Sequence, residues 1–160
     1  MLGRSYFNID SLKLAEKNFK IARKLDKEDF KIDLYLGHIY KLKKDYKKSL
    51  FSYYIATSKG KKERSEEYYS LGMLHLETKK SKIAIKMFDL ALKENRNKYR
   101  ALYQKALTSD SYYSDKKIAY HLYDEFVLRF EEKDKELTDF VKNRMKEIKK
   151  DLFLKGEKVE

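Results

Sequence analysis

The residue types that perform chemistry in proteins are sparse in this chain of 160 residues, and they are not grouped. The three histidines, His38, His75 and His121, have no spacing to one another or to a carboxylate pair that is typical of a metal site. The chain contains no Cys, which excludes disulfides, thiolate ligands and a cysteine nucleophile. Its five glycines are scattered singly, so no phosphate-binding loop is present. We therefore expect neither an enzyme nor a cofactor or metal site.

Small, aromatic and small residues recur at the spacing i, i+4 and i+7, which places them on one face of a helix. The sets are Ala15, Phe19 and Ala22; Ser49, Tyr53 and Ala56; Ala84, Phe88 and Ala91; and, more loosely, Ala119, Tyr123 and Phe126. Their first members lie 34, 35 and 35 residues apart. A period of this length predicts a solenoid, in which each repeat buries its apolar face only against its neighbours.

A second pattern keeps the same period: Leu-Gly followed by a ring-bearing residue three positions after the glycine. Its members are Leu2-Gly3 with Tyr6, Leu36-Gly37 with Tyr40, Leu71-Gly72 with His75, and a degenerate Lys105-Ala106 with Ser109. An unrelated helical bundle with a recurring apolar stripe is the alternative. Two patterns that hold one register through three intervals argue against it.

A repeat with Leu-Gly-x-x-Tyr in its first half and Ala-x-x-x-Phe-x-x-Ala in its second resembles the tetratricopeptide repeat (TPR). The resemblance implies an all-α, right-handed superhelical solenoid of antiparallel helix pairs, helix A followed by helix B. The chain departs from the family where Trp is replaced by Asp33, Tyr68 and Leu102, and where the closing Pro is absent. Without Pro, helix starts must rely on N-cap residues, for which we expect Asp10, Asp45, Ser81 and Ser114.

The register divides one continuous domain into repeats. The expected parts are a partial repeat (1–29), two complete repeats (30–64 and 65–98), a degenerate repeat (99–133) and an amphipathic capping helix (134–154). The buried stripe of the capping helix should contain Leu137, Val141, Met145, Ile148 and Leu152.

The N-terminus and the compartment follow less directly. Because Gly3 corresponds to Gly37, a complete first repeat would begin about five residues before Met1, and we expect the chain to be a fragment of a longer protein. No run of 18 apolar residues occurs, so no transmembrane helix is expected. The sequence leaves the compartment open: cytoplasmic by default, and extracytoplasmic if a signal or anchor has been removed.

In the TPR family, helix A lines a concave groove, and ligand contacts come from positions three before, one after and four after the repeat glycine. The resemblance places there Leu34, His38, Lys41, Tyr69, Met73, Leu76, Tyr103 and Leu107, with Asp110 at the last position of the degenerate repeat. At the places where chaperone-binding members clamp a terminal carboxylate, this chain has Leu34, His38, Tyr69, Met73, Tyr103 and Leu107, none of which has a charge suited to that task. An apolar groove for a peptide or helix of another protein is therefore implied. The alternative is that the protein itself covers these side chains.

The net charge of +12 gives a second hypothesis. Lysines gather at two turns between helix A and helix B, which should lie side by side along one edge. They are Lys43, Lys44, Lys47, Lys48, Lys79, Lys80 and Lys82. This basic edge could hold an anionic partner: nucleic acid, an acidic protein or a membrane surface. No nucleic-acid-binding motif accompanies it, and a lysine run usually marks a solvated face, so a non-enzymatic protein-interaction module is the favoured prediction.

Overall fold

The computed structural model describes residues 11–59 and 64–157, and these residues form α-helices joined by short turns, with no strand among them. The helices are α2 (Leu12–Leu25), α3 (Phe30–Leu42), α4 (Tyr46–Lys59), α5 (Ser65–Glu77), α6 (Ser81–Glu94), α7 (Tyr99–Tyr112), α8 (Lys116–Phe130) and α9 (Lys135–Leu154). The chain divides into two compact units, Met1–Lys79 and Lys80–Glu160. The predicted all-α class is confirmed. The first Leu-Gly-x-x-Tyr element (Leu2, Gly3 and Tyr6) and the expected N-cap Asp10 lie outside the described residues.

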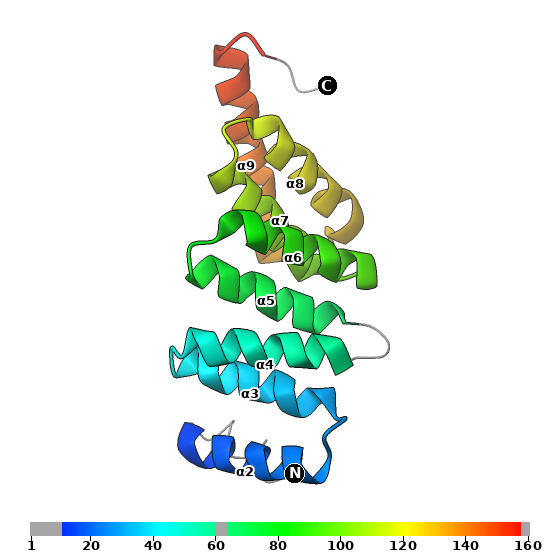
Figure 1. Ribbon diagram of the computed structural model, residues 1–160. Coiled ribbons are helices and arrows are strands. Elements are labelled where there is room, and N and C mark those ends of the chain that lie inside the picture. Colours follow the sequence, from blue (N-terminus) through cyan, green and yellow to red (C-terminus); the bar gives the residue numbers. More distant parts are fainter. Residues whose placement is uncertain (1–10, 60–63, 158–160) are drawn as a thin grey trace. The chain divides into compact units, whose positions relative to one another are not determined.

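Helices α2 to α5 of the first unit follow one another in space in the order of the sequence (Figure 1). The apolar core between α2 and α3 is built from Ala15 and Phe19 on α2 and from Leu36, Ile39 and Tyr40 on α3. Phe19 also stacks on Tyr35, with ring centroids 5.2 Å apart. The small-aromatic-small pattern thus marks the face of α2 that is buried, although Ala22 is only half-buried.

The pairing of α3 with α4 depends on the second copy of the same pattern. Ser49, Tyr53 and Ala56 are all fully buried. The Ser49 hydroxyl donates a hydrogen bond of 2.9 Å to the carbonyl oxygen of Gly37 on α3. Because neither Gly37 nor Ser49 has a bulky side chain, the two helices approach closely at this point.

Helices α6 to α9 form the second unit around a larger aromatic core. Tyr123, Phe126 and Phe130 of α8 pack with Leu102 of α7 and Val141 of α9. The aromatic Phe126 takes the last small position of the repeat pattern and is fully buried. The substitution of a large residue for a small one is therefore absorbed by the core of this unit.

The C-terminal helix α9 closes the second unit, as the amphipathic pattern predicts. The Asp134 side chain accepts a hydrogen bond from the Leu137 backbone N–H and caps the helix. Of the predicted stripe, Val141, Ile148 and Leu152 are buried, and Leu137 and Met145 pack partly buried against the same core. The face with Lys146, Lys149 and Lys150 is exposed.

Two of the three N-cap predictions that can be compared are wrong. Asp45 does cap α4, because its carboxylate accepts a hydrogen bond from the Lys48 backbone N–H at 3.3 Å. Ser81 is instead the first residue inside α6, preceded by Lys80 at the cap position. Ser114 is displaced by its neighbour Asp115, whose side chain accepts from the Lys117 backbone N–H. The negative charge of the aspartate side chain at the helix N-terminus favours Asp115 over Ser114.

Each of the two lysine-rich turns between a helix A and a helix B contains a lysine whose backbone is in the left-handed conformation. Lys44 and Lys79 each have φ of +58°. After α3, the Asp45 N–H donates to the Tyr40 carbonyl at 2.9 Å, which closes a Schellman motif around Lys44. A lysine therefore occupies a backbone position that glycine adopts at lower cost.

Candidate protein-interaction surfaces

The predicted groove residues of the first unit lie on the helices A of that unit, α3 and α5. Leu34, His38 and Lys41 on α3 are half-buried, and so are Tyr69, Met73 and Leu76 on α5. An ion pair of 2.9 Å between Lys41 Nζ and Glu77 Oε1 joins the C-terminal ends of the two helices. The six side chains thus belong to neighbouring helices, and they are neither core residues nor fully solvated.

His38 is tied to the core of the α3–α4 pair. Its Nδ1 shares a hydrogen bond of 2.8 Å with the Tyr53 hydroxyl, and the two rings meet edge to face with centroids 5.4 Å apart. Burial lowers the pKa of His38 below its ordinary value, because the charged imidazolium is desolvated there. The neutral form of His38 is therefore favoured, and its ring holds the Tyr53 hydroxyl from one of the predicted groove positions.

Tyr103 in the second unit is partly covered by the capping helix. Its ring lies 5.9 Å from that of Phe126 on α8 and 6.2 Å from that of Phe140 on α9. Burial raises the pKa of the Tyr103 hydroxyl. Leu107, one turn further along α7, is half-buried. For Tyr103, the alternative that the protein covers its own groove position therefore holds in part.

Phe140 is a surface residue that the repeat patterns do not indicate. It is 46% exposed and packs against Tyr103. It lies three residues after Leu137, beside the stripe that predicts the buried face of α9 rather than within it. The spacing of three residues from Leu137 was the one feature of the sequence that placed Phe140 next to the buried face of α9.

Asp110, expected at the last groove position of the degenerate repeat, is occupied by the protein itself. Arg144 on α9 donates to both carboxylate oxygens, from Nε at 2.7 Å and from Nη2 at 3.1 Å. Lys116 Nζ lies 3.3 Å from Oδ1, and the Tyr123 hydroxyl donates to Oδ2 at 3.3 Å. Although burial by itself raises the pKa of Asp110, the hydrogen bonds from Arg144 and Lys116 hold it below its ordinary value. This carboxylate anchors the cap and is not available to a ligand.

Part of the predicted basic edge is neutralised within the first unit. Lys43 forms an ion pair of 2.5 Å with Glu16, and Lys48 forms one of 2.6 Å with Asp45. Partial burial favours the neutral form of Glu16, but hydrogen bonds from Lys20, Lys43 and the Tyr40 hydroxyl lower its pKa to about 2. All seven lysines of the edge are exposed, including Lys43 and Lys48 with their ion pairs. That the two lysine clusters lie side by side stays a prediction.

Neither a metal centre nor a membrane span emerges from the part of the chain that the structure describes. Residues 11–59 and 64–157 contain no group of three His, Asp or Glu side chains placed to hold an ion. Within the same ranges, no helix is long and apolar enough to cross a membrane. His75 is buried on α5, as Tyr40 is at the corresponding position of α3, and His121 is exposed on α8.

Solved structures identify the fold. YrrB, a TPR protein with an unusual peptide-binding site, superposes with a TM-score of 0.66 at 18% identity. The match covers 80% of this chain and 65% of the YrrB chain, so this chain spans less than two thirds of the length of YrrB. MamA gives a TM-score of 0.71 at 19% identity over 98% of this chain and 97% of its own. The pilF protein of Pseudomonas aeruginosa gives 0.73 at 20% identity over 94% and 72%. No protein-family model and no curated protein matches the sequence. The chain has the fold of a tetratricopeptide-repeat solenoid.

Proposed function

We propose that the chain is a non-enzymatic interaction module that binds a peptide or helix of another protein along the inner face of its helices A. The observation that carries this proposal is the half-buried apolar surface of α3 and α5. Leu34, Tyr69, Met73 and Leu76 combine partial exposure with positions on two helices joined by the Lys41–Glu77 ion pair. Such partly exposed side chains can gain buried area when a partner covers them.

The chemistry of the surface favours a peptide with apolar anchors. Met73 has an unbranched side chain that adapts to different partner shapes. Tyr69 offers a large apolar ring with a polar hydroxyl, a combination that is enriched where interfaces are strongest. His38 and Lys41 add polar groups near the apolar positions, where they could orient a peptide backbone. YrrB, which has the same fold, has a peptide-binding site, and this supports a peptide as the class of ligand.

Two sets of substitutions test the proposal. Tyr69→Ala with Met73→Ala removes apolar anchors, each worth about 1–2 kcal/mol or more in typical interfaces. Tyr103 is left intact because its ring packs on Phe126. The matched charge variant replaces Lys43, Lys44, Lys79 and Lys80 with Glu. Partners are recovered from an extract of the native organism with the unaltered protein, identified, and then measured as purified proteins against both variants.

We expect the anchor variant to lose binding while its circular dichroism spectrum still shows a folded helical protein, with a modestly lowered melting temperature because both side chains are half-buried. The charge variant should bind more slowly and dissociate at nearly the original rate, as substitutions of rim charges do. Retained binding by the anchor variant would overturn the proposal that the partner binds in the groove. If only the charge variant lost binding, the binding site would be the basic edge. The affinity for the partner should then fall steeply with salt concentration.

A further inference from the structure

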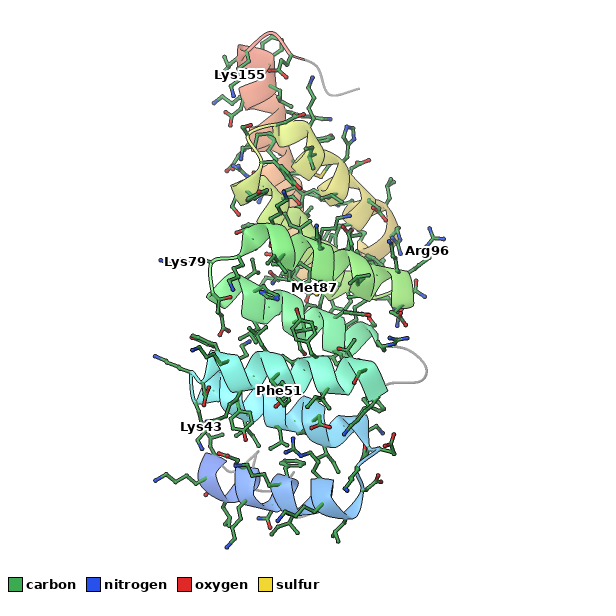
Figure 2. All side chains as sticks on the ribbon, viewed as in Figure 1. Lys43, Phe51, Lys79, Met87, Arg96 and Lys155 are labelled. Carbon is green, nitrogen blue, oxygen red and sulfur yellow. The ribbon has the colours of Figure 1, made fainter. Side chains whose placement is uncertain are left out.

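A second surface of the first unit lies between α2 and α4, the two helices B of that unit. It contains a hollow of about 560 Å³ lined by residues of α2, of the loop that follows α2, of the start of α3 and of α4. Phe51 and Ile55 of α4 form its apolar part, and Lys20, Lys24 and Lys27 lie on the opposite side. Figure 2 marks Phe51 on α4. None of these residues belongs to the proposed groove.

The apolar side of this hollow departs from the repeat pattern. Phe51 is 66% exposed, Tyr54 is 50% exposed and Ile55 is half-buried, at i, i+3 and i+4 on one face of α4. In repeat register, the position of Phe51 is filled by Lys17, Lys86 and His121 in the other helices B, and that of Tyr54 by Lys20, Asp89 and Asp124. Polar residues thus occupy these solvent positions everywhere except on α4. The exception is unfavourable for solubility and indicates a contact surface.

The other side is a ridge of lysines along α2. Lys13, Lys17, Lys20 and Lys24 follow one another at spacings of 4, 3 and 4 residues, which places them on one face, and all four are exposed. At a rise of 1.5 Å per residue the ridge is about 16 Å long. Lys27 extends it into the loop after α2. A straight row of this length matches a partner helix of about three turns.

The carboxylates of the first unit neutralise only part of this charge. Asp33, which is fully buried at the base of the hollow, pairs with Arg23 at 3.2 Å and with Lys59 at 2.5 Å. Lys20 pairs with Glu16 at 2.6 Å. Among the residues that the structure describes, Lys24 and Lys27 take part in no ion pair. Glu28, an exposed carboxylate of the loop after α2, also lines the hollow, so Lys24 and Lys27 are available to a ligand beside one negative charge.

We propose that the hollow between α2 and α4 binds an acidic amphipathic helix of another protein. Its apolar stripe would cover Phe51, Tyr54 and Ile55, and its carboxylates would face Lys20, Lys24 and Lys27. Charge complementarity selects this occupant over a second copy of the chain, which carries a net charge of +12 and is repelled. The bases of a single-stranded nucleic acid can stack on Phe51 and Tyr54, but they have no aliphatic group for Ile55, so an oligonucleotide is included as an arm of the test.

A designed peptide serves as the probe. It is an amphipathic helix of about four turns with Leu along one stripe and Glu along the adjacent stripe at i, i+4, i+7 and i+11. The control is a peptide of the same sequence in which every Glu is replaced by Gln. Binding is followed by fluorescence anisotropy at about 0.15 M salt, and the isoleucine methyl groups of the protein are observed by NMR. We expect the Glu peptide to bind at least about tenfold more tightly than the Gln peptide. The methyl signal of Ile55 should shift, and those of Ile118 and Ile148 should not.

Protein variants locate the site. Phe51→Ala and the pair Lys24→Glu with Lys27→Glu should each weaken binding about tenfold or more, with unchanged melting temperatures because these side chains are exposed. The matched control, Lys146→Glu with Lys150→Glu, makes the same change of net charge on the exposed face of α9 and should leave binding unaltered.

Three results would overturn the proposal. The first is equal binding of the Glu and Gln peptides, including no binding of either. The second is an equal loss in the α9 control, which would show that net charge alone attracts the peptide. The third is tighter binding of a single-stranded oligonucleotide, or of vesicles containing phosphatidylserine, that depends on Lys24 and Lys27. The Tyr69 and Met73 variant serves to separate the two surfaces, because it should bind the probe normally whether or not the proposed groove exists.

Discussion

The ring of Tyr53 on α4 lies directly over Gly37 on α3. A Cβ atom added to Gly37 would be 2.4 Å from both Cδ1 and Cε1 of that ring, well inside van der Waals contact. The ring has no freedom to withdraw, because it is fully buried and its hydroxyl is hydrogen-bonded to His38. The glycine of one pattern and the aromatic residue of the other are therefore two halves of a single helix–helix contact, which explains why they keep the same period.

Gly37→Ala should therefore destabilise the protein by about 1–3 kcal/mol, the range expected for overpacking a buried interface. Urea unfolding followed by circular dichroism provides the measurement. In combination with Tyr53→Leu, which removes the ring atoms in question, the cost of the alanine should be smaller than in the original background. If the two substitutions were additive, the proposed clash would not be the cause.

The sequence predicted the elements of the fold well because its periodic signal comes from this kind of contact. The repeat spacing is kept by the starts of α3, α5 and α7 at Phe30, Ser65 and Tyr99. The amphipathic stripe of α9 is also confirmed residue by residue. Such patterns are local consequences of helical geometry, and one chain contains several copies of them.

Contacts that depend on a single pair of side chains were beyond prediction. Nothing in the repeat pattern indicated that Arg144 would bind Asp110, or that Phe140 would lie against Tyr103. The buried Asp33, with its partners Arg23 and Lys59, was noted only as a departure from the family's Trp. The prediction of the groove from family positions did not include these contacts, because a pairwise interaction occurs once and leaves no period in the sequence.

Lys44→Gly and Lys79→Gly should each stabilise the protein by about 0.5–1 kcal/mol. Both residues have φ of +58°. In this conformation the Cβ atom of lysine comes close to a backbone carbonyl oxygen, whereas glycine has no Cβ atom and avoids this repulsion. Glycine also gains flexibility in the unfolded chain, which limits the benefit. Lys86→Gly, at an exposed position inside α6, is the control and should cost about 1 kcal/mol. Thermal melts of the three variants give the comparison, and destabilisation by both turn substitutions would contradict the prediction.

Glu16 should make the first unit sensitive to acid. Its pKa is lowered to about 2 in the folded protein from an ordinary value of 4.5, so folding favours the charged form. The resulting stabilisation is complete above about pH 4.5 and is lost as the pH falls toward 2. In Glu16→Gln this contribution is absent at every pH. The difference in unfolding free energy between the two proteins should therefore shrink between pH 5 and pH 2, as denaturant titrations at a series of pH values can show. A difference that stayed constant over this range would rule out the linkage.

Arg144 should anchor the capping helix to α7 through its two hydrogen bonds to Asp110. Arg144→Ala leaves a buried carboxylate with Lys116 and Tyr123 as its remaining partners, and the loss of a charged hydrogen-bonding group at such a site costs about 1.5–3 kcal/mol. Arg144→Lys should recover only part of this stability, because an ammonium group cannot reproduce the two-pronged geometry of guanidinium.

The location of the loss distinguishes this anchor from a general effect of charge. In Arg144→Ala, the rate of amide hydrogen exchange should rise in α9 and at the C-terminal end of α7, which contains Asp110. These two segments separate when the capping helix detaches. Lys146→Ala removes a positive charge from the exposed face of the same helix and should leave both stability and exchange unchanged. Asp110→Asn combined with Arg144→Ala should cost less than the sum of the single changes, because the buried charge that needed a partner is gone. Additive costs in this cycle would show that the two side chains stabilise the cap independently.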